Sequence, residues 1–129
     1  MIRVLVILHN AYGGHGGIAK FNRDLLEALV AAPDTGTVEV IPRLRPDEPA
    51  TPPETLIYRT DAASGFTAFF KALLCRTFRG GGPDIVICGH IRLIFAAWLV
   101  SALRRCKLVL VMHGTEVWGD MKCRHRRPL

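Results

Sequence analysis

The stretch VLVILHNAYGGHGGIAKFNRDLLEAL, from Val4 to Leu29, decides the fold. Its first five residues form a continuous apolar run, which predicts a strand that is covered on both faces and belongs to a parallel sheet. A glycine-rich segment follows, and from Ile18 the apolar residues recur at helical spacing until Pro33 ends the pattern. A strand, a glycine loop and a helix in this order bring free N–H groups and the positive end of a helix dipole to one sheet edge. This edge is therefore the predicted site for a phosphate or another anion.

The rest of the chain continues to alternate strands and helices. The other predicted elements are strands at 37–41, 55–58, 84–88 and 107–112 and helices at 65–79 and 91–105. Ser64 is the expected cap of the first of these helices. The second is apolar nearly all round and should be largely buried. Five prolines in residues 42–54 predict an extended loop.

Strands joined by long crossovers predict an α/β fold: a doubly wound, Rossmann-like parallel sheet of about five strands in the order 3-2-1-4-5. Ligands bind such sheets beside the first and fourth strands, where the strand order reverses. The length of 129 residues fits one domain. We expect that domain to span residues 1–120 and a basic tail to occupy residues 121–129.

Composition and charge narrow the classes of function. The formal charge of +6 favours an anionic partner, and no nucleic-acid-binding motif accompanies it. The four cysteines are widely spaced without a CxxC pair, which indicates reduced thiols and no metal site. The apolar N-terminal run is too short for a signal peptide, and residues 91–100 are too few for a membrane span. We therefore expect a cytoplasmic protein that is attached at most to the inner face of a membrane.

Four histidines should converge on the crevice where the strand order reverses. His9, His90 and His113 each follow the carboxyl end of a predicted strand, and His15 lies in the glycine loop. An imidazole can donate or accept a hydrogen bond at neutral pH, so it suits contacts with sugar hydroxyls and phosphates, or general base chemistry. The alternative is that these are ordinary loop histidines bonded to backbone carbonyls.

A dinucleotide site is the first alternative for the glycine loop, because Gly14 to Ala19 satisfies the pattern G-x-G-x-x-A. In that fingerprint the first glycine follows the strand almost directly, whereas here residues 9–13 intervene. An acidic residue should also end the second strand to hold a ribose. Ile41, Pro42 and Arg43 stand there instead, which disfavours a dinucleotide.

Glu116 follows His113 by three positions in the loop after the last predicted strand. It is a candidate catalytic residue that orients His113 or binds a substrate hydroxyl. The alternative is an ordinary solvated carboxylate.

Three segments are informative together: the loop and helix at 16–29, the strand at 83–87 with His90, and the strand and turn at 108–116. In this order they resemble the N-terminal, acceptor-side domain of family 4 retaining glycosyltransferases with the GT-B fold. Residues 16–29 look like the family's opening loop and first helix. Residues 83–87 with His90 resemble its fourth strand, and residues 108–116 are similar to its fifth strand and the following His-Gly-x-Glu turn. The resemblance covers residues 1 to about 120, which would be one half of a GT-B fold.

The resemblance implies an enzyme that transfers a sugar, with retention, from a nucleotide donor to a lipid, glycan or small acceptor. Gly16 and Gly17 would lie at the loop that approaches the donor phosphate, and His113 at the position of the histidine that contacts the reacting sugar. His9, His15 and His90 are further candidates for substrate or phosphate binding. The implied partners are the nucleotide sugar, which is a substrate, and the acceptor; no cofactor or metal is implied.

The family's donor-binding second domain is not matched, and no two glutamates here have its E-x7-E spacing. We therefore expect a truncated or split half that needs a donor-binding half and is inactive alone. The alternative is a non-catalytic module, either truncated or a partner, that binds acceptor or membrane. An NAD(P)-binding fragment is a weaker alternative.

The helix predicted at 65–79 could also contact a membrane surface. It carries four phenylalanines, with Lys71, Arg76 and Arg79 among them, and no acidic residue lies in 62–83. Aromatic residues with basic flanks suit an interfacial helix on anionic lipid. The alternative is that the same face packs against the sheet.

Overall fold

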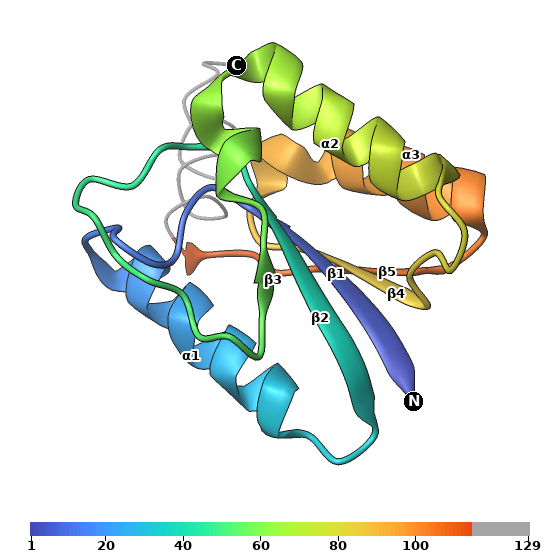
Figure 1. Ribbon diagram of the computed structural model, residues 1–129, viewed down its shortest axis with the longest axis horizontal. Helices are drawn as coiled ribbons and strands as arrows, with labels where there is room; N and C mark the ends of the chain where they lie inside the picture. The colour runs from blue at the N-terminus through green and yellow to red at the C-terminus, as the bar shows by residue number, and fades with distance from the viewer. Residues whose placement is uncertain (115–129) are drawn as a thin grey trace, which may run out of the picture.

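The computed structural model describes residues 1–114, and it confirms an α/β fold with a five-stranded parallel sheet (Figure 1). The strand order is β3-β2-β1-β4-β5, as the sequence predicts. The strands are β1 Ile2–Leu8, β2 Thr35–Pro42, β3 Ile57–Tyr58, β4 Ile85–Cys88 and β5 Lys107–Leu110. The helices are α1 Gly17–Ala31, α2 Phe66–Phe78 and α3 Ile94–Arg104, with short 3-10 helices at Thr60–Ser64 and Ile91–Leu93.

β1 is the centre of the sheet, because it pairs with β2 on one side and with β4 on the other. In the register, Val6 lies between Val40 and Ile87, and all four pairs of neighbouring strands in the sheet run parallel. The last five residues of β1 are all buried, which explains why this strand is apolar at every position rather than at alternate ones.

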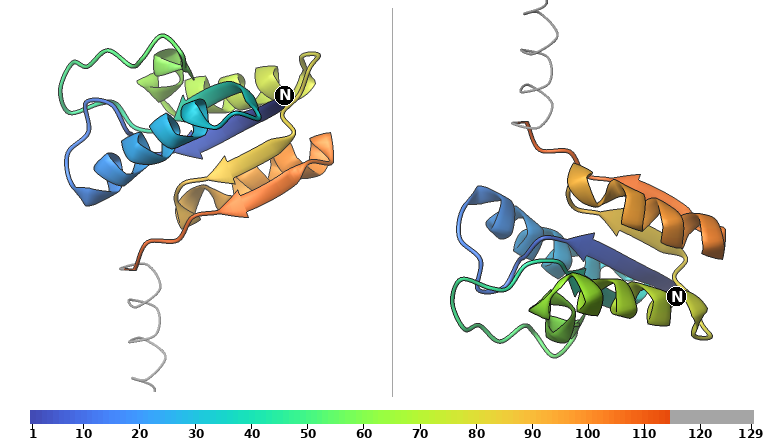
Figure 2. Two further views of the ribbon diagram at one scale, coloured as in Figure 1. Left: turned by 90° about the horizontal axis from the view of Figure 1, so that it is seen from below. Right: turned by 90° about the horizontal axis from the view of Figure 1, so that it is seen from above.

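Alternate residues of β1 point into two separate cores. Leu5 and Ile7 pack with Phe69 of α2 and Ala97 of α3. Val4, Val6 and Leu8 lie on the other face, with Leu26 of α1. Figure 2 shows the same arrangement, with α1 on one side of the sheet and α2 and α3 on the other. The sheet is therefore doubly wound.

The amino-terminal ends of β1 and β4 are joined by an exposed ion pair. Nη2 of Arg3 lies 3.0 Å from Oδ1 of Asp84, and Oδ2 of Asp84 also accepts a hydrogen bond from the backbone N–H of Arg3 at 2.8 Å. These bonds to Arg3 lower the pKa of Asp84 to about 2. The pair fixes the register of two strands that are distant in sequence.

Several element boundaries differ from the sequence prediction. Ser64 does not cap α2, because its hydroxyl donates to the carbonyl of Asp61 at 2.8 Å and Gly65 occupies the cap position. The turn at Thr60–Ser64 is a 3-10 helix that the sequence pattern did not predict. β3 and β5 are also shorter than predicted.

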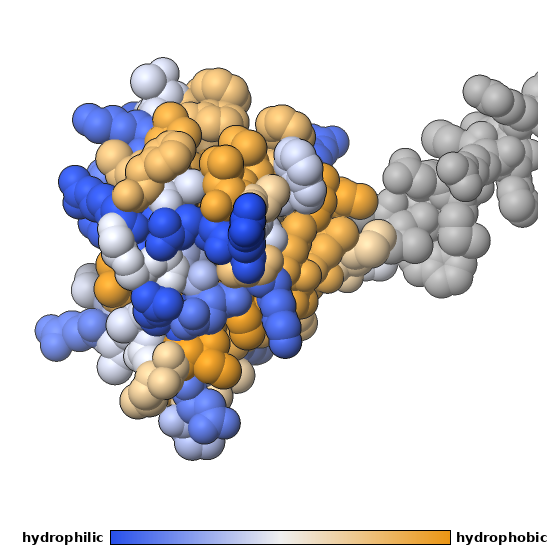
Figure 3. Space-filling view, turned by 90° about the vertical axis from the view of Figure 1, so that its right-hand side faces the viewer, coloured by the Kyte–Doolittle hydropathy of each residue, from blue (hydrophilic) through white to orange (hydrophobic). Residues whose placement is uncertain are grey.

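The prediction that the helix at 91–105 is largely buried is wrong for its outer face. The segment begins as a 3-10 turn, and in α3 the side chains of Phe95 and Trp98 are exposed, with ring centroids 6.0 Å apart. α3 packs on the sheet with one side only, through Ala96, Ala97 and Val100. Figure 3 shows hydrophobic surface lying between hydrophilic patches on the side of the molecule that it views.

Within residues 1–114, no helix combines the length and the apolar character that a membrane crossing requires.

Candidate functional site

Three histidines meet at the carboxyl edge of the sheet. His9 follows β1 and His90 follows β4, and their rings are stacked with centroids 4.1 Å apart and planes 22° apart. His113 follows β5, and its ring centroid lies 6.5 Å from that of His90. Convergence is therefore observed for these three residues at the point where the strand order reverses. Their roles stay a prediction.

Backbone contacts fix which ring nitrogens carry protons. Nε2 of His113 lies 3.1 Å from the carbonyl oxygen of Gly89, which can only accept. In neutral His113 the proton is therefore on Nε2, and Nδ1 is an acceptor. Nδ1 of His90 accepts from the N–H of Arg92 at 3.2 Å, so the proton of neutral His90 is on Nε2. The two contacts thus use opposite roles of the imidazole: Nε2 of His113 donates, and Nδ1 of His90 accepts.

The glycine loop ends at the first turn of α1 without a side-chain cap. Gly16 is the N-cap residue, and no acidic residue stands in the first turn. Its φ of +90° is a conformation that only glycine adopts readily. A Cβ on Gly17 would meet nothing within 4 Å, so packing in the described residues does not explain this second glycine. The first N–H groups of α1 are thus open to an anion.

His15 is paired with the loop after β2. Its Nε2 lies 3.3 Å from Oε1 of Glu48, and its backbone N–H donates to Asp47 at 3.3 Å. Glu48 in turn donates its N–H to the carbonyl of Gly13 at 3.0 Å. No contact of His15 with the other three histidines is seen in residues 1–114, so the predicted convergence does not extend to this residue.

Two residues of α1 donate hydrogen bonds to backbone carbonyls of the glycine loop. Asn22, which is buried, donates to the carbonyl of Asn10 at 2.9 Å. Arg23 donates to the carbonyls of Ala11 at 2.7 Å and Gly14 at 3.0 Å. The helical pattern of the sequence gave no signal of this contact. These bonds rigidify the loop that precedes the open helix start.

An aromatic side chain links α1 to the histidine cluster. The ring of Phe21 lies edge-on to that of His113, with centroids 5.5 Å apart, and Phe21 is partly exposed. The amino-terminal part of α1 therefore lies beside His113, and the two parts of the predicted site share one edge.

Glu116, the other catalytic candidate, lies outside the described residues, as does the predicted tail at 121–129. Within residues 1–114, no group of three or more His, Cys, Asp and Glu side chains is arranged to hold a metal ion.

The structure supports the arguments against a dinucleotide. β1 ends at Leu8 and α1 begins at Gly17, so a long loop replaces the tight turn of that fingerprint. β2 ends at Pro42 and is followed by Arg43, which has no carboxylate to hold a ribose. The backbone N–H of Arg43 donates to the carbonyl of Leu8 at 2.8 Å.

The aromatic face of α2 is divided between core and surface. Phe69 is buried against the sheet, whereas Phe66 and Phe78, at the two ends of the helix, are exposed. Packing on the sheet therefore accounts for the middle of this face. Contact with an anionic membrane stays a prediction.

Comparison of the chain with family models, with curated proteins and with solved structures finds no match.

Proposed function

We propose that this chain is the acceptor-side half of a nucleotide-sugar-dependent glycosyltransferase and acts with a donor-binding half. The observation that carries the proposal is the cluster of His9, His90 and His113 beside the open start of α1. Both lie at the edge where an open α/β sheet binds its ligands.

The two parts of this edge suit the two parts of a nucleotide sugar. The N–H groups and dipole at the first turn of α1 attract a diphosphate, and Gly17 leaves room for close approach. The imidazoles at this edge suit sugar hydroxyls, because a histidine ring can donate or accept a hydrogen bond at neutral pH. In this proposal the donor-binding half supplies the remaining stabilisation of the leaving diphosphate, which is usually a large term in catalysis.

A second candidate is a non-catalytic module that binds the acceptor or an anionic membrane. The exposed pair of Phe95 and Trp98 favours it, because Arg92 and Arg105 lie near the two ends of the same segment. Exposed aromatic and basic side chains on one helix suit a lipid interface.

Titration of the isotope-labelled chain, followed by amide NMR, tests the proposal. We expect UDP-glucose or GDP-mannose to shift the amides of residues 14–19 and the ring signals of His90 and His113. Gly17→Val should abolish these shifts, because its side chain would occupy the space for the phosphate, while the melting temperature stays near that of the wild type. NAD⁺ is the matched control and should produce no such response.

Tighter binding of NAD⁺ than of either nucleotide sugar, or an unchanged response in Gly17→Val, would contradict the proposal. Vesicle binding that is lost in Trp98→Ala, without any response to nucleotide sugars, would favour the second candidate. The purified chain should transfer little or no sugar by itself.

A further inference from the structure

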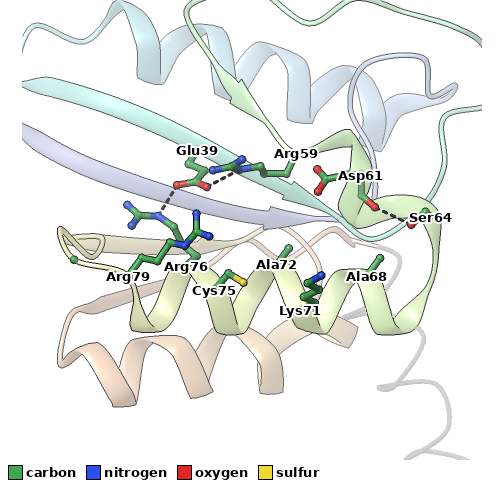
Figure 4. Close-up of a pocket in the computed structure, with 11 residues that line it drawn as sticks. Glu39, Arg59, Asp61, Ser64, Ala68, Lys71, Ala72, Cys75, Arg76 and Arg79 are labelled. Carbon is green, nitrogen blue, oxygen red and sulfur yellow. Dashed lines mark hydrogen bonds and ion pairs between the residues drawn. The ribbon is translucent and has the colours of Figure 1, made fainter.

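A second concave site lies between β2, β3 and α2, at the edge of the sheet opposite β5 (Figure 4). Its volume is about 580 Å³, within the range of small-molecule sites. None of the candidate histidines lines it, so this pocket is separate from the candidate site at the carboxyl ends of the strands.

Small side chains on one stripe of α2 create the space. Ala68, Ala72 and Cys75 line the pocket at helical spacing, whereas Phe69 and Leu73 on the neighbouring stripe fill the core. A larger residue at Ala68, which is only half buried, would therefore fill the pocket without disturbing the core.

Positive charge dominates the lining. The basic side chains are Arg59, Lys71, Arg76 and Arg79, and the acidic ones are Glu39 and Asp61. In Figure 4, Arg76 and Arg79 lie toward one end of the pocket, and Asp61 and Ser64 lie toward the other. The pocket therefore has a basic end and an end that accepts hydrogen bonds.

The buried carboxylate of Glu39 fixes two of the four cations. Its Oε1 lies 3.0 Å from Nε of Arg59, and its Oε2 contacts Nε of Arg76. Arg76 also donates through Nη2 to the carbonyl of Gly81 at 3.1 Å. The two guanidinium groups are thus held in place beside the pocket, and each keeps further N–H donors.

The other two cations are not neutralised by the fold. Within residues 1–114, neither Lys71 nor Arg79 forms an ion pair, and both are exposed at the rim of the pocket. Four cations and two carboxylates line the pocket, and Glu39 is shared by two of the cations, so the net positive charge suits an anionic ligand.

We propose that this pocket binds the phosphate group of a phosphorylated, hydroxyl-bearing small molecule of the sugar phosphate class. A phosphate monoester carries a charge of about −1.5 to −2 near neutral pH and three acceptor oxygens, which match guanidinium donors. The carboxylate of Asp61 would accept hydrogen bonds from the hydroxyl groups at the other end.

Binding measured by calorimetry and amide NMR on the full chain tests this proposal. The probes are glucose 6-phosphate, glucose and inorganic phosphate, with phosphatidylcholine vesicles that contain or lack phosphatidic acid. Glucose 6-phosphate should shift the amides of residues 59–64 and 71–80, and glucose should not. Vesicle binding that requires phosphatidic acid would identify a lipid headgroup as the source of the same phosphate.

Arg79→Ala and Lys71→Ala should each weaken glucose 6-phosphate binding about tenfold, the scale of one charge-assisted hydrogen bond. Ala68→Leu should abolish binding without changing any charge. Lys107→Ala, which removes an exposed cation at the opposite edge of the sheet, is the matched control and should bind like the wild type.

Equal binding of glucose and glucose 6-phosphate would overturn the proposal. So would wild-type affinity in both Arg79→Ala and Ala68→Leu, or the absence of any response to all phosphate probes. Gly17→Val tests the nucleotide-sugar site at the carboxyl ends of the strands. It should not change the binding of glucose 6-phosphate in this pocket.

Discussion

Two regions of the molecule border the same sheet but are built in different ways. We call the carboxyl ends of β1, β4 and β5, with His9, His90 and His113, the histidine edge. We call the cavity between β2, β3 and α2, around Glu39, the basic pocket. At the histidine edge, side chains with no formal charge come together because parallel strands end side by side. In the basic pocket, charged side chains come together because α2 packs beside β2 and β3, around the buried carboxylate of Glu39. The charges of Glu39, Arg59 and Arg76 therefore contribute to holding the fold together, whereas the histidines are placed by the strands that precede them.

Removing the carboxylate at the centre of the pocket should have the largest effect. Glu39→Ala leaves Arg76 mostly buried without its partner, while Arg59 is half exposed and can return to water. We expect a loss of about 2–3 kcal/mol in the free energy of unfolding, below the 3–5 kcal/mol of a fully buried pair. Urea denaturation measures this difference.

Glu54→Ala, which removes an exposed loop carboxylate, is the control for Glu39→Ala and should change stability by less than about 0.5 kcal/mol. If Glu39→Ala were equally mild, the pocket's charges would not be structural, and the contrast between the two regions would fail.

The exposed ion pair of Arg3 and Asp84 shows how much charge alone contributes to stability, because neither side chain is buried. Asp84 is ionised in the folded chain down to a pH of about 2, below its ordinary pKa of 3.8. A lowered pKa adds stability above that ordinary value, and this stability is lost as pH falls from about 4 toward 2. Asp84→Asn should therefore be less stable than the wild type at pH 7, and the difference should shrink over that acid range.

Thermal unfolding between pH 7 and 2 measures this convergence. Asp24→Asn removes a carboxylate from an exposed helical pair with Lys20 and serves as the control. A gap between wild type and Asp84→Asn that stays constant at all pH values would contradict the assignment of the pKa shift to Arg3.

The smallest effect on stability is expected at the histidine edge. A Cβ on Gly17 meets nothing, so Gly17→Ala should leave the free energy of unfolding unchanged or raise it by up to about 1 kcal/mol. Gly13→Ala is the contrasting variant, because its φ is +79° and its Cβ would collide with the backbone of Glu48. A clear loss of stability in Gly17→Ala would show that this glycine serves the fold rather than a ligand.

The sequence predicted the sheet and the histidine cluster because both depend on strand order. The apolar runs of β1 and β4 set the order, and the order places His9 beside His90. The basic pocket could not be predicted in this way, since it depends on how α2 rotates against β2 and β3. One signal was present: Glu39 stands between Val38 and Val40 in a buried strand, and a buried carboxylate requires a cationic partner.

The sequence also failed to predict the cap of α2 and the exposed side of α3. The hydroxyl of Ser64 bonds within its own 3-10 turn instead of capping α2, a choice between two nearby backbone partners that the sequence does not decide. The exposure of Phe95 and Trp98 depends on which side of α3 meets the sheet, and helical periodicity fails to reveal this in a segment that is apolar all round.

The position of β1 at the centre of the sheet has a consequence for how the chain is made. β1 leaves the ribosome well before β4, because the two paired strands are 81 positions apart in sequence, as at Arg3 and Asp84. Until β4 emerges, one row of backbone N–H and C=O groups on an apolar strand has no native partner. Contacts between such distant residues form slowly. The nascent chain therefore passes through a stage in which its most aggregation-prone segment is complete and half paired, which is the stage where a chaperone would be needed most.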